Sequence, residues 1–147
     1  MNSFKMDIDA LLGKNKRILI TGGAGFIGSH LVEKLLNENH QIIILDNLST
    51  GRFENVESFI NDIEFLNVDI SKKGDWMKKF EKVDKVFHLA ALADIVPSIK
   101  TPDLYFHSNV TSTLNILEAM KEHNVKKIFY SASSSCYGVP TNYPTSE

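Results

Sequence analysis

Apolar runs of strand length alternate with amphipathic runs of helix length along most of this chain. The apolar runs lie at residues 17–21, 41–46, 63–69, 83–90 and 126–133. They lack a strict alternation of apolar and polar positions, which is typical of strands that are covered on both faces. The pattern therefore predicts a parallel sheet of about five strands with helices on both sides.

The segments between these strands supply the helices. Amphipathic spacing predicts a helix at residues 26–39, a turn and short helix at 51–60, and another short helix at 74–82. Residues 91–101 are expected to be irregular, and the proline-containing segment 136–147 is expected to be a loop.

The longest predicted helix covers residues 102–123 and begins at Pro102, because proline suits the first turn of a helix. Side chains close to one of its faces are Asn109, Thr113, Ile116, Leu117 and Met120. Repeated strand–helix–strand units make right-handed crossovers. The expected fold class is therefore α/β, a doubly wound Rossmann-type sheet with strand order 3-2-1-4-5.

Length and composition fit one globular domain. Residues 17–147 are expected to form it, after a short leader at 1–16 with one helical turn at 8–12. The net charge of −2 provides no basic field, which argues against nucleic acid or an anionic membrane as a partner. No apolar run approaches the roughly 20 residues of a membrane span. The single cysteine, Cys136, favours a reducing, cytoplasmic location, and no metal site is predicted.

The first predicted strand runs directly into a glycine-rich turn, "TGGAGFIG", that opens the first helix. Gly22 would allow a sharp turn, Gly25 the approach of a pyrophosphate, and Gly28 close packing of helix on strand. Free N–H groups at the helix start would favour a phosphate. A tight turn without a ligand is the alternative.

Acidic residues follow the second and third predicted strands. Asp46 lies about 20 residues after the glycines, where an acid binds the adenosine ribose and favours NAD over NADP. Asp69 is expected near the adenine, with a turn or helix-capping role as the alternative. Arg52 could serve a 2′-phosphate, but a solvated surface arginine is the favoured interpretation.

Six motifs in this order resemble the extended short-chain dehydrogenase/reductase superfamily. They are "TGGAGFIG", "LDNLSTG", "VDI", "HLAA", "NVTSTLNILEA" and "SASSSCYG", and the resemblance covers about residues 17–147. Together they are most similar to the NAD-dependent epimerase/dehydratase family, in particular its UDP-glucose 4-epimerase branch.

The resemblance implies a set of NAD contacts that runs from the pyrophosphate through the ribose and adenine to the nicotinamide. These residues are Gly22, Gly25, Phe26, Ile27, Gly28, Asp46, Asn47, Thr50, Gly51, Asp69, Ile70, Leu89, Ala90, Ala91, Asn109 and Ser131. It also implies a UDP-sugar substrate and a homodimer for the whole enzyme.

The resemblance assigns the chemistry to Ser133, four residues before Tyr137. The family places a Ser or Thr there that hydrogen-bonds the reacting sugar hydroxyl, and a hydroxyl can both donate and accept. A strand-end serine that satisfies loop backbone is the alternative. Ser134 and Ser135 stand where dehydratases of the family carry an Asp-Glu pair, so dehydration is disfavoured. For His88 a structural role is favoured.

The superfamily's base, a tyrosine followed four residues later by a lysine, does not occur in these 147 residues. The chain is therefore expected to be the N-terminal, NAD-binding part of an epimerase, truncated before the later strands and the substrate domain, and inactive alone. Two alternatives stay open. One is a non-catalytic dinucleotide-binding module, and the other is part of a related nucleotide-sugar decarboxylase or reductase.

Overall fold

The structure is a computed structural model that describes residues 12–139, apart from the side chains of Ser134 and Ser135. Its centre is a parallel five-stranded sheet in the order β3-β2-β1-β4-β5. The strands are β1 (Arg17–Thr21), β2 (Gln41–Asp46), β3 (Ile63–Asn67), β4 (Lys85–His88) and β5 (Ile128–Tyr130). The predicted fold class and strand order are confirmed.

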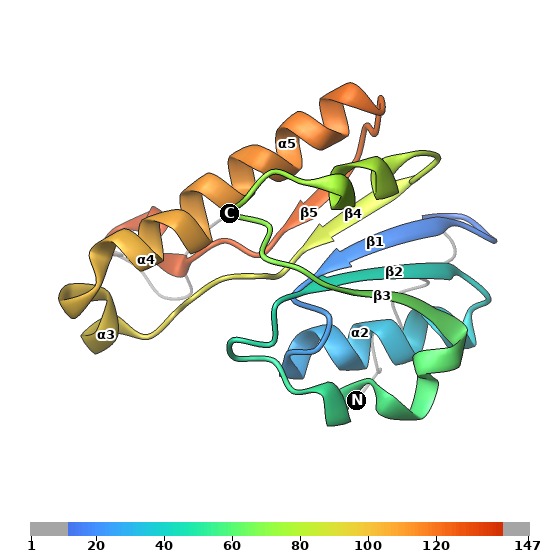
Figure 1. The fold of residues 1–147 in the computed structure, drawn as a ribbon, viewed down its shortest axis with the longest axis horizontal. Coiled ribbons are helices and arrows are strands. Elements are labelled where there is room, and N and C mark those ends of the chain that lie inside the picture. Colours follow the sequence, from blue (N-terminus) through green and yellow to red (C-terminus); the bar gives the residue numbers. More distant parts are fainter. Residues whose placement is uncertain (1–11, 140–147) are drawn as a thin grey trace.

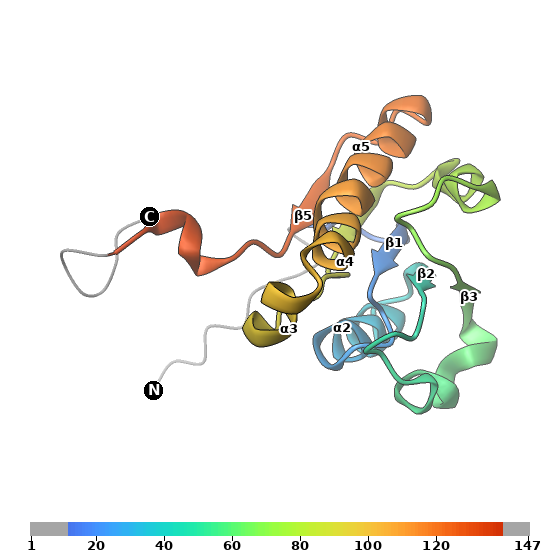
Figure 2. The same cartoon turned by 60° about the vertical axis from the view of Figure 1, so that its left-hand side comes forward.

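Helices cover both faces of the sheet (Figures 1 and 2). Alternate side chains of each central strand enter different cores, which explains the unbroken apolar runs. On one face Ile18 and Ile20 pack with the helix α2 (Phe26–Asn37). On the other face Leu19 packs with α5 (Ser112–Glu122).

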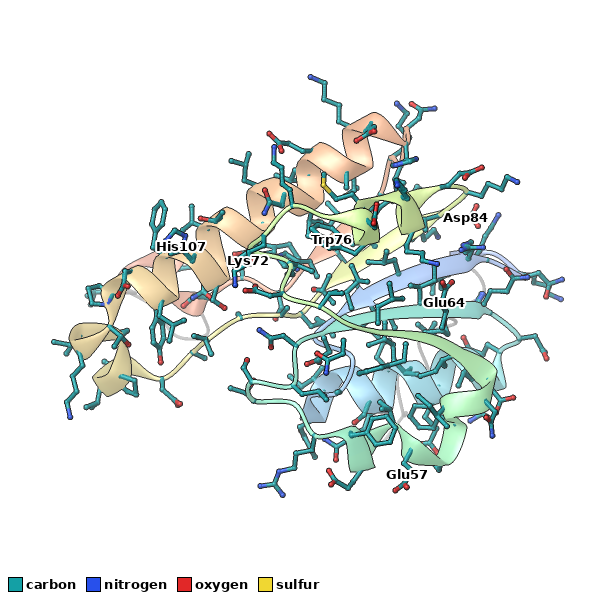
Figure 3. The ribbon with its side chains drawn as sticks, in the orientation of Figure 1. Glu57, Glu64, Lys72, Trp76, Asp84 and His107 are labelled. Atoms are coloured by element: carbon teal, nitrogen blue, oxygen red, sulfur yellow. The ribbon has the colours of Figure 1, made fainter. Side chains whose placement is uncertain are left out.

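The shorter predicted helices are 3₁₀ turns. They are η1 (Phe53–Asn55), η2 (Glu57–Asp62) and η3 (Asp75–Phe80), with a further turn, η5 (Ser134–Tyr137), in the segment expected to continue as strand and loop. Trp76 and Phe80 of η3 are buried beneath α5, and the Trp76 indole N–H donates to the Lys72 carbonyl at 2.8 Å (Figure 3). These two buried aromatic residues anchor η3.

The segment at residues 91–101, expected to be irregular, contains the helix α3 (Ile95–Lys100). Pro97 lies in the first turn of α3, where its missing N–H has no helical acceptor to lose, so it is compatible with the helix. The prediction of an irregular segment was therefore wrong for Ile95–Lys100.

The long predicted helix is present but divided into α4 (Pro102–Phe106), a π-helical turn η4 (His107–Thr111), and α5. The Ser112 N–H donates to the His107 carbonyl five residues back, which is the π-helical spacing. Of the five side chains predicted to lie close to one face, Ile116 and Met120 are buried, whereas Leu117 is 46% exposed. Leu117 lies about 100° around the helix from Ile116.

The ends of the chain lie mostly outside the described residues. The predicted turn at 8–12 is represented only by Leu12, which is helical and buried in the core beside Ile18. The loop predicted for 136–147 is described as far as residue 139. No helix among the described residues is long and apolar enough to cross a membrane.

Candidate functional site

A groove lies at the carboxyl ends of the strands, where ligands bind in doubly wound sheets. It runs between the ends of β1, β2 and β4, the segment that follows β3, and the π-turn of the long helix. Its lining residues are Gly22, Gly25, Leu45, Asp46, Asn47, Ser49, Thr50, Gly51, Val68, Asp69, Ile70, Leu89, Ala90, Ala91, Ser108 and Ser112. Eleven of these are among the sixteen predicted cofactor contacts.

The floor of the groove is the glycine turn between β1 and α2. Gly22 has a φ of +71°, in the left-handed region, and a Cβ there would lie 2.8 Å from the Ala90 nitrogen. A Cβ on Gly28 would overlap the Gly22 carbonyl oxygen. The turn can therefore close only with glycine at both positions. No side chain caps α2 at Gly25, so the N–H groups of its first turn keep their capacity to bind an anion.

Ala24, inside this turn, ties the turn to the segment that follows β2. Its carbonyl oxygen accepts from the Arg52 N–H at 3.0 Å and the Asn55 side-chain amide at 2.8 Å. Its N–H donates to Asp46 Oδ2 at 2.9 Å. These three bonds hold the segment after β2 against the glycine turn. The main chain of Arg52 is fixed in this way, while the Arg52 side chain is exposed.

Asp46 is only 7% exposed, yet it is one of the residues that line the groove. Oδ2 accepts from Ala24, and Oδ1 accepts from the Leu48 N–H at 2.8 Å. A carboxylate has about four acceptor positions. Two remain for another donor, which suits a pair of ribose hydroxyls. The glycine turn and this carboxylate together fit a dinucleotide.

Asp69 forms a turn with the residues that follow it. Its Oδ1 accepts from the Ser71 N–H at 3.0 Å and the Ser71 hydroxyl at 2.7 Å, and Lys72 lies 3.4 Å from Oδ2. Partial burial raises the pKa of Asp69, but the bonds from Ser71 and Lys72 outweigh it and leave this pKa below its usual value. The turn-forming alternative is thus real, although Asp69 also lines the groove.

On the far side of the groove, asparagines of the long helix hold the walls. The Asn109 amide donates to the Leu92 carbonyl and accepts from the Leu92 N–H, both at 2.8 Å. The Asn115 amide donates to the carbonyls of Ile70 at 2.9 Å and Ser71 at 3.0 Å. The long helix therefore fixes the segments after both β3 and β4.

His88, at the end of β4, is 1% exposed and contacts hydroxyls on both sides. Nδ1 lies 2.6 Å from Thr21 Oγ1 and Nε2 lies 2.9 Å from Thr113 Oγ1, while the ring stacks on Tyr130. Burial disfavours the charged ring and lowers the pKa of His88 to about 4. These contacts agree with the structural role that the sequence favoured.

Because His88 is buried in its neutral form, we expect the free energy of unfolding to fall in mild acid. The unfolded chain takes up its proton near pH 6.5 and the folded chain near pH 4. The stability that neutral His88 contributes to the fold is therefore complete above pH 6.5 and is lost as the pH falls towards 4. Between pH 7 and pH 5 the free energy of unfolding is expected to drop by about 2 kcal/mol. Urea unfolding titrations at pH 7 and pH 5 measure this drop in the free energy of unfolding.

The matched variants for this prediction are His88→Asn and His30→Gln, since His30 is exposed on α2. We expect the His88→Asn chain to lose most of the drop and the His30→Gln chain to keep it. Equal drops in all three chains would contradict the assignment to His88.

The remaining predicted site residues do not line the groove. Phe26 and Ile27 are 78% and 67% exposed, and Gly28 packs against Gly22. Asn109 is engaged with Leu92. Ser131 and Ser133 are exposed on the segment after β5, which extends away from the sheet (Figure 2). Their assigned roles stay predictions.

Three serines that the sequence interpretation passed over line the groove: Ser49, Ser108 and Ser112. Ser108 and Ser112 are four residues apart on the long helix, next to Asn109. The four-residue spacing places the two hydroxyls on one face of the helix, and it was the available signal. Ser49 follows β2 in a loop and has no such signal.

Comparison with known proteins identifies the family. A model of the NAD dependent epimerase/dehydratase family matches residues 18–147. The chain belongs to this family. Within it, the chain is 37% identical to a bifunctional UDP-glucose 4-epimerase and UDP-xylose 4-epimerase of Pisum sativum, over 93% of this chain and 42% of that protein.

Solved structures of the epimerase/dehydratase family have the same fold. A UDP-N-acetylglucosamine 4-epimerase from Methanobrevibacter ruminantium, in complex with UDP-N-acetylmuramic acid, is 38% identical with a TM-score of 0.83, over 91% of this chain and 43% of that one. A UDP-glucose 4-epimerase from Stenotrophomonas maltophila, with bound NAD and formylated UDP-arabinopyranose, is 31% identical with a TM-score of 0.81, over 88% and 40%. The chain thus spans about two fifths of the length of these relatives. The predicted family and the NAD dependence of that family are confirmed.

Proposed function

We propose that the chain is the NAD-binding portion of a UDP-sugar 4-epimerase. The observation that carries the proposal is Asp46, which lines the same groove as the glycine turn at the uncapped start of α2. Its carboxylate has acceptor positions left after binding Ala24 and Leu48. The similarity to several 4-epimerases supports this reaction over decarboxylation or reduction.

In this proposal the groove residues divide the cofactor among them. N–H groups at the start of α2 hold the pyrophosphate. Asp46 accepts from the adenosine ribose hydroxyls, and Asp69 and Ile70 flank the adenine. Leu89, Ala90 and Ala91 line the path towards the nicotinamide. When bound, NAD supplies reversible hydride transfer at the sugar C4.

Ser133 is proposed to hydrogen-bond the reacting sugar hydroxyl and to hold its proton for transfer. The 147 residues contain no tyrosine with a lysine four positions later, and Ser133 alone provides no strong base. We therefore propose that this chain binds the cofactor and does not epimerise a sugar by itself. A cytoplasmic location likewise stays a proposal, based on the single cysteine.

Calorimetry of the purified chain tests the proposal directly. NAD is expected to bind at least about tenfold more tightly than NADP, because a 2′-phosphate would meet the Asp46 carboxylate. With UDP-glucose and saturating NAD, no UDP-galactose is expected. Absence of heat with NAD would overturn the binding proposal, whereas epimerisation at an enzymatic rate would overturn only the proposed inactivity.

We also propose that the longer enzyme is a homodimer with the long helix in its interface. Phe106, Val110, Leu114 and Leu117 are all about half exposed and lie three or four positions apart, on one face. Such a stripe favours association. Light scattering is expected to find dimers of the chain that Leu114→Glu dissociates, and a wild-type monomer at high concentration would contradict this.

A further inference from the structure

A continuous row of polar groups crosses the molecule behind the groove, from the segment after β4 to the π-turn of the long helix. In order along the row, its members are the Ala90 N–H, the Thr21 hydroxyl, the His88 ring, the Thr113 hydroxyl and the Asn109 carbonyl. We propose that Thr21, His88 and Thr113 act as positioning residues that set the width of the groove on its β4 side.

The direction of each hydrogen bond in this row follows from the capacity of each group. Thr113 has one hydroxyl proton, and at 2.6 Å it donates to the Asn109 carbonyl, which can only accept. Thr113 Oγ1 must then accept from His88 Nε2–H at 2.9 Å. The neutral ring has one N–H, so Nδ1 accepts from the Thr21 hydroxyl at 2.6 Å.

The row ends on groups that shape the groove. At one end Thr21 Oγ1 accepts from the Ala90 N–H at 3.2 Å, and Ala90 is a groove-lining residue. At the other end Thr113 binds the carbonyl of Asn109, whose amide holds Leu92 at two points. The segment after β4 is therefore held from below by Thr21 and from the side by Asn109, with His88 joining the two supports.

The π-turn makes this arrangement possible. Ser108 lines the groove from this turn, and Ser112, the first residue of α5, lines it directly after the turn. The Ser112 hydroxyl donates to the His107 carbonyl at 3.1 Å. Thr113, one residue later, reaches His88 beneath the groove. A rigid row at this position sets the distance between the Ala90 wall and the serine wall, and a ligand between them depends on that distance.

The inference rests on the proposed function, because the ligand it concerns is the dinucleotide. Its test uses three variants of the full chain, all checked by thermal unfolding and compared well below their midpoints. Thr113→Val keeps the shape and removes both hydroxyl bonds, Thr113→Ser restores them, and Thr111→Val is the matched control. The Thr111 hydroxyl contacts only the exposed His107 in the described part of the chain.

Calorimetry is expected to show about tenfold weaker NAD binding for Thr113→Val. Thr113→Ser and Thr111→Val are expected to stay within about twofold of wild type. The ¹⁵N spectrum of the His88 ring is expected to show one neutral tautomer with Nε2–H, which Thr113→Val disturbs. If Thr113→Val disturbs the tautomer but binds NAD like wild type, the row is merely structural and the inference is overturned.

Failure of the proposed function would be recognised separately, because wild-type chain would then bind no NAD. In that case amide hydrogen exchange at Ala90 and Leu92 decides the inference. Faster exchange at both sites in Thr113→Val, but not in Thr111→Val, supports the positioning role, and unchanged exchange overturns it.

Discussion

Gly28→Ala is expected to destabilise the fold by about 3 kcal/mol and to abolish NAD binding. A Cβ at this position would overlap the Gly22 carbonyl oxygen, which is main chain and cannot move aside as a flexible side chain could. Either α2 shifts away from β1 or the turn opens. Since small domains are stable by only about 5–15 kcal/mol, the loss is a large share of the total.

Gly74→Ala is the matched control for this substitution. Gly74 has an extended backbone, and a Cβ there would lie 3.6 Å from the Trp76 ring, an ordinary contact. We expect its free energy of unfolding to stay within about 0.5 kcal/mol of wild type. Urea unfolding and NAD calorimetry measure both chains. A Gly28→Ala chain as stable as Gly74→Ala would show that the turn is more adaptable than its geometry indicates.

Asp46→Asn is expected to weaken both the fold and the binding of NAD. The two carboxylate oxygens accept from Ala24 and Leu48, and an amide can accept from only one of these N–H groups. The other is left unsatisfied, which costs about 1–3 kcal/mol. NAD affinity is expected to fall at least about tenfold, and NADP affinity less, because the charge that opposes a 2′-phosphate is gone.

Asp84→Asn is the control for Asp46→Asn because its carboxylate also accepts from a main-chain N–H, that of Arg17 at 2.9 Å. Asp84 lies at the end of the sheet remote from His107 and the groove, and it is exposed (Figure 3). An amide at position 84 can keep its single main-chain bond. We expect a small change in stability and no change in NAD affinity, and an equal loss of affinity in both chains would contradict the role of Asp46.

The sheet and much of the groove were predictable because each depends on local patterns. A run such as residues 41–46, with apolar side chains on both faces, indicates a strand that is covered on both sides. The spacing of the glycines after a strand limits the turn to few conformations. Asp46 was predictable as a groove residue from its position at a strand end. Its bonds to Ala24 and Leu48 were not, since they depend on how a loop folds back over a turn 22 residues earlier.

The helices after β4 were harder to predict for a different reason. Pro97 is a helix breaker in most positions, and only its place in the first turn of α3 makes it compatible with a helix. The π-turn at His107–Thr111 has no signature that the sequence analysis could use. Ser108 and Ser112 were missed with it.

The π-turn at His107–Thr111 also has an evolutionary consequence. A wide turn acts as a one-residue insertion, and one residue rotates everything beyond it by about 100° around the helix axis. A descendant that lost a residue between Ser108 and Ser112 would keep either Ser108 at the groove or the contacts of Ser112 and Asn115 beyond the turn, but not both. We therefore expect homologues with this groove to reject insertions and deletions between Ser108 and Asn115.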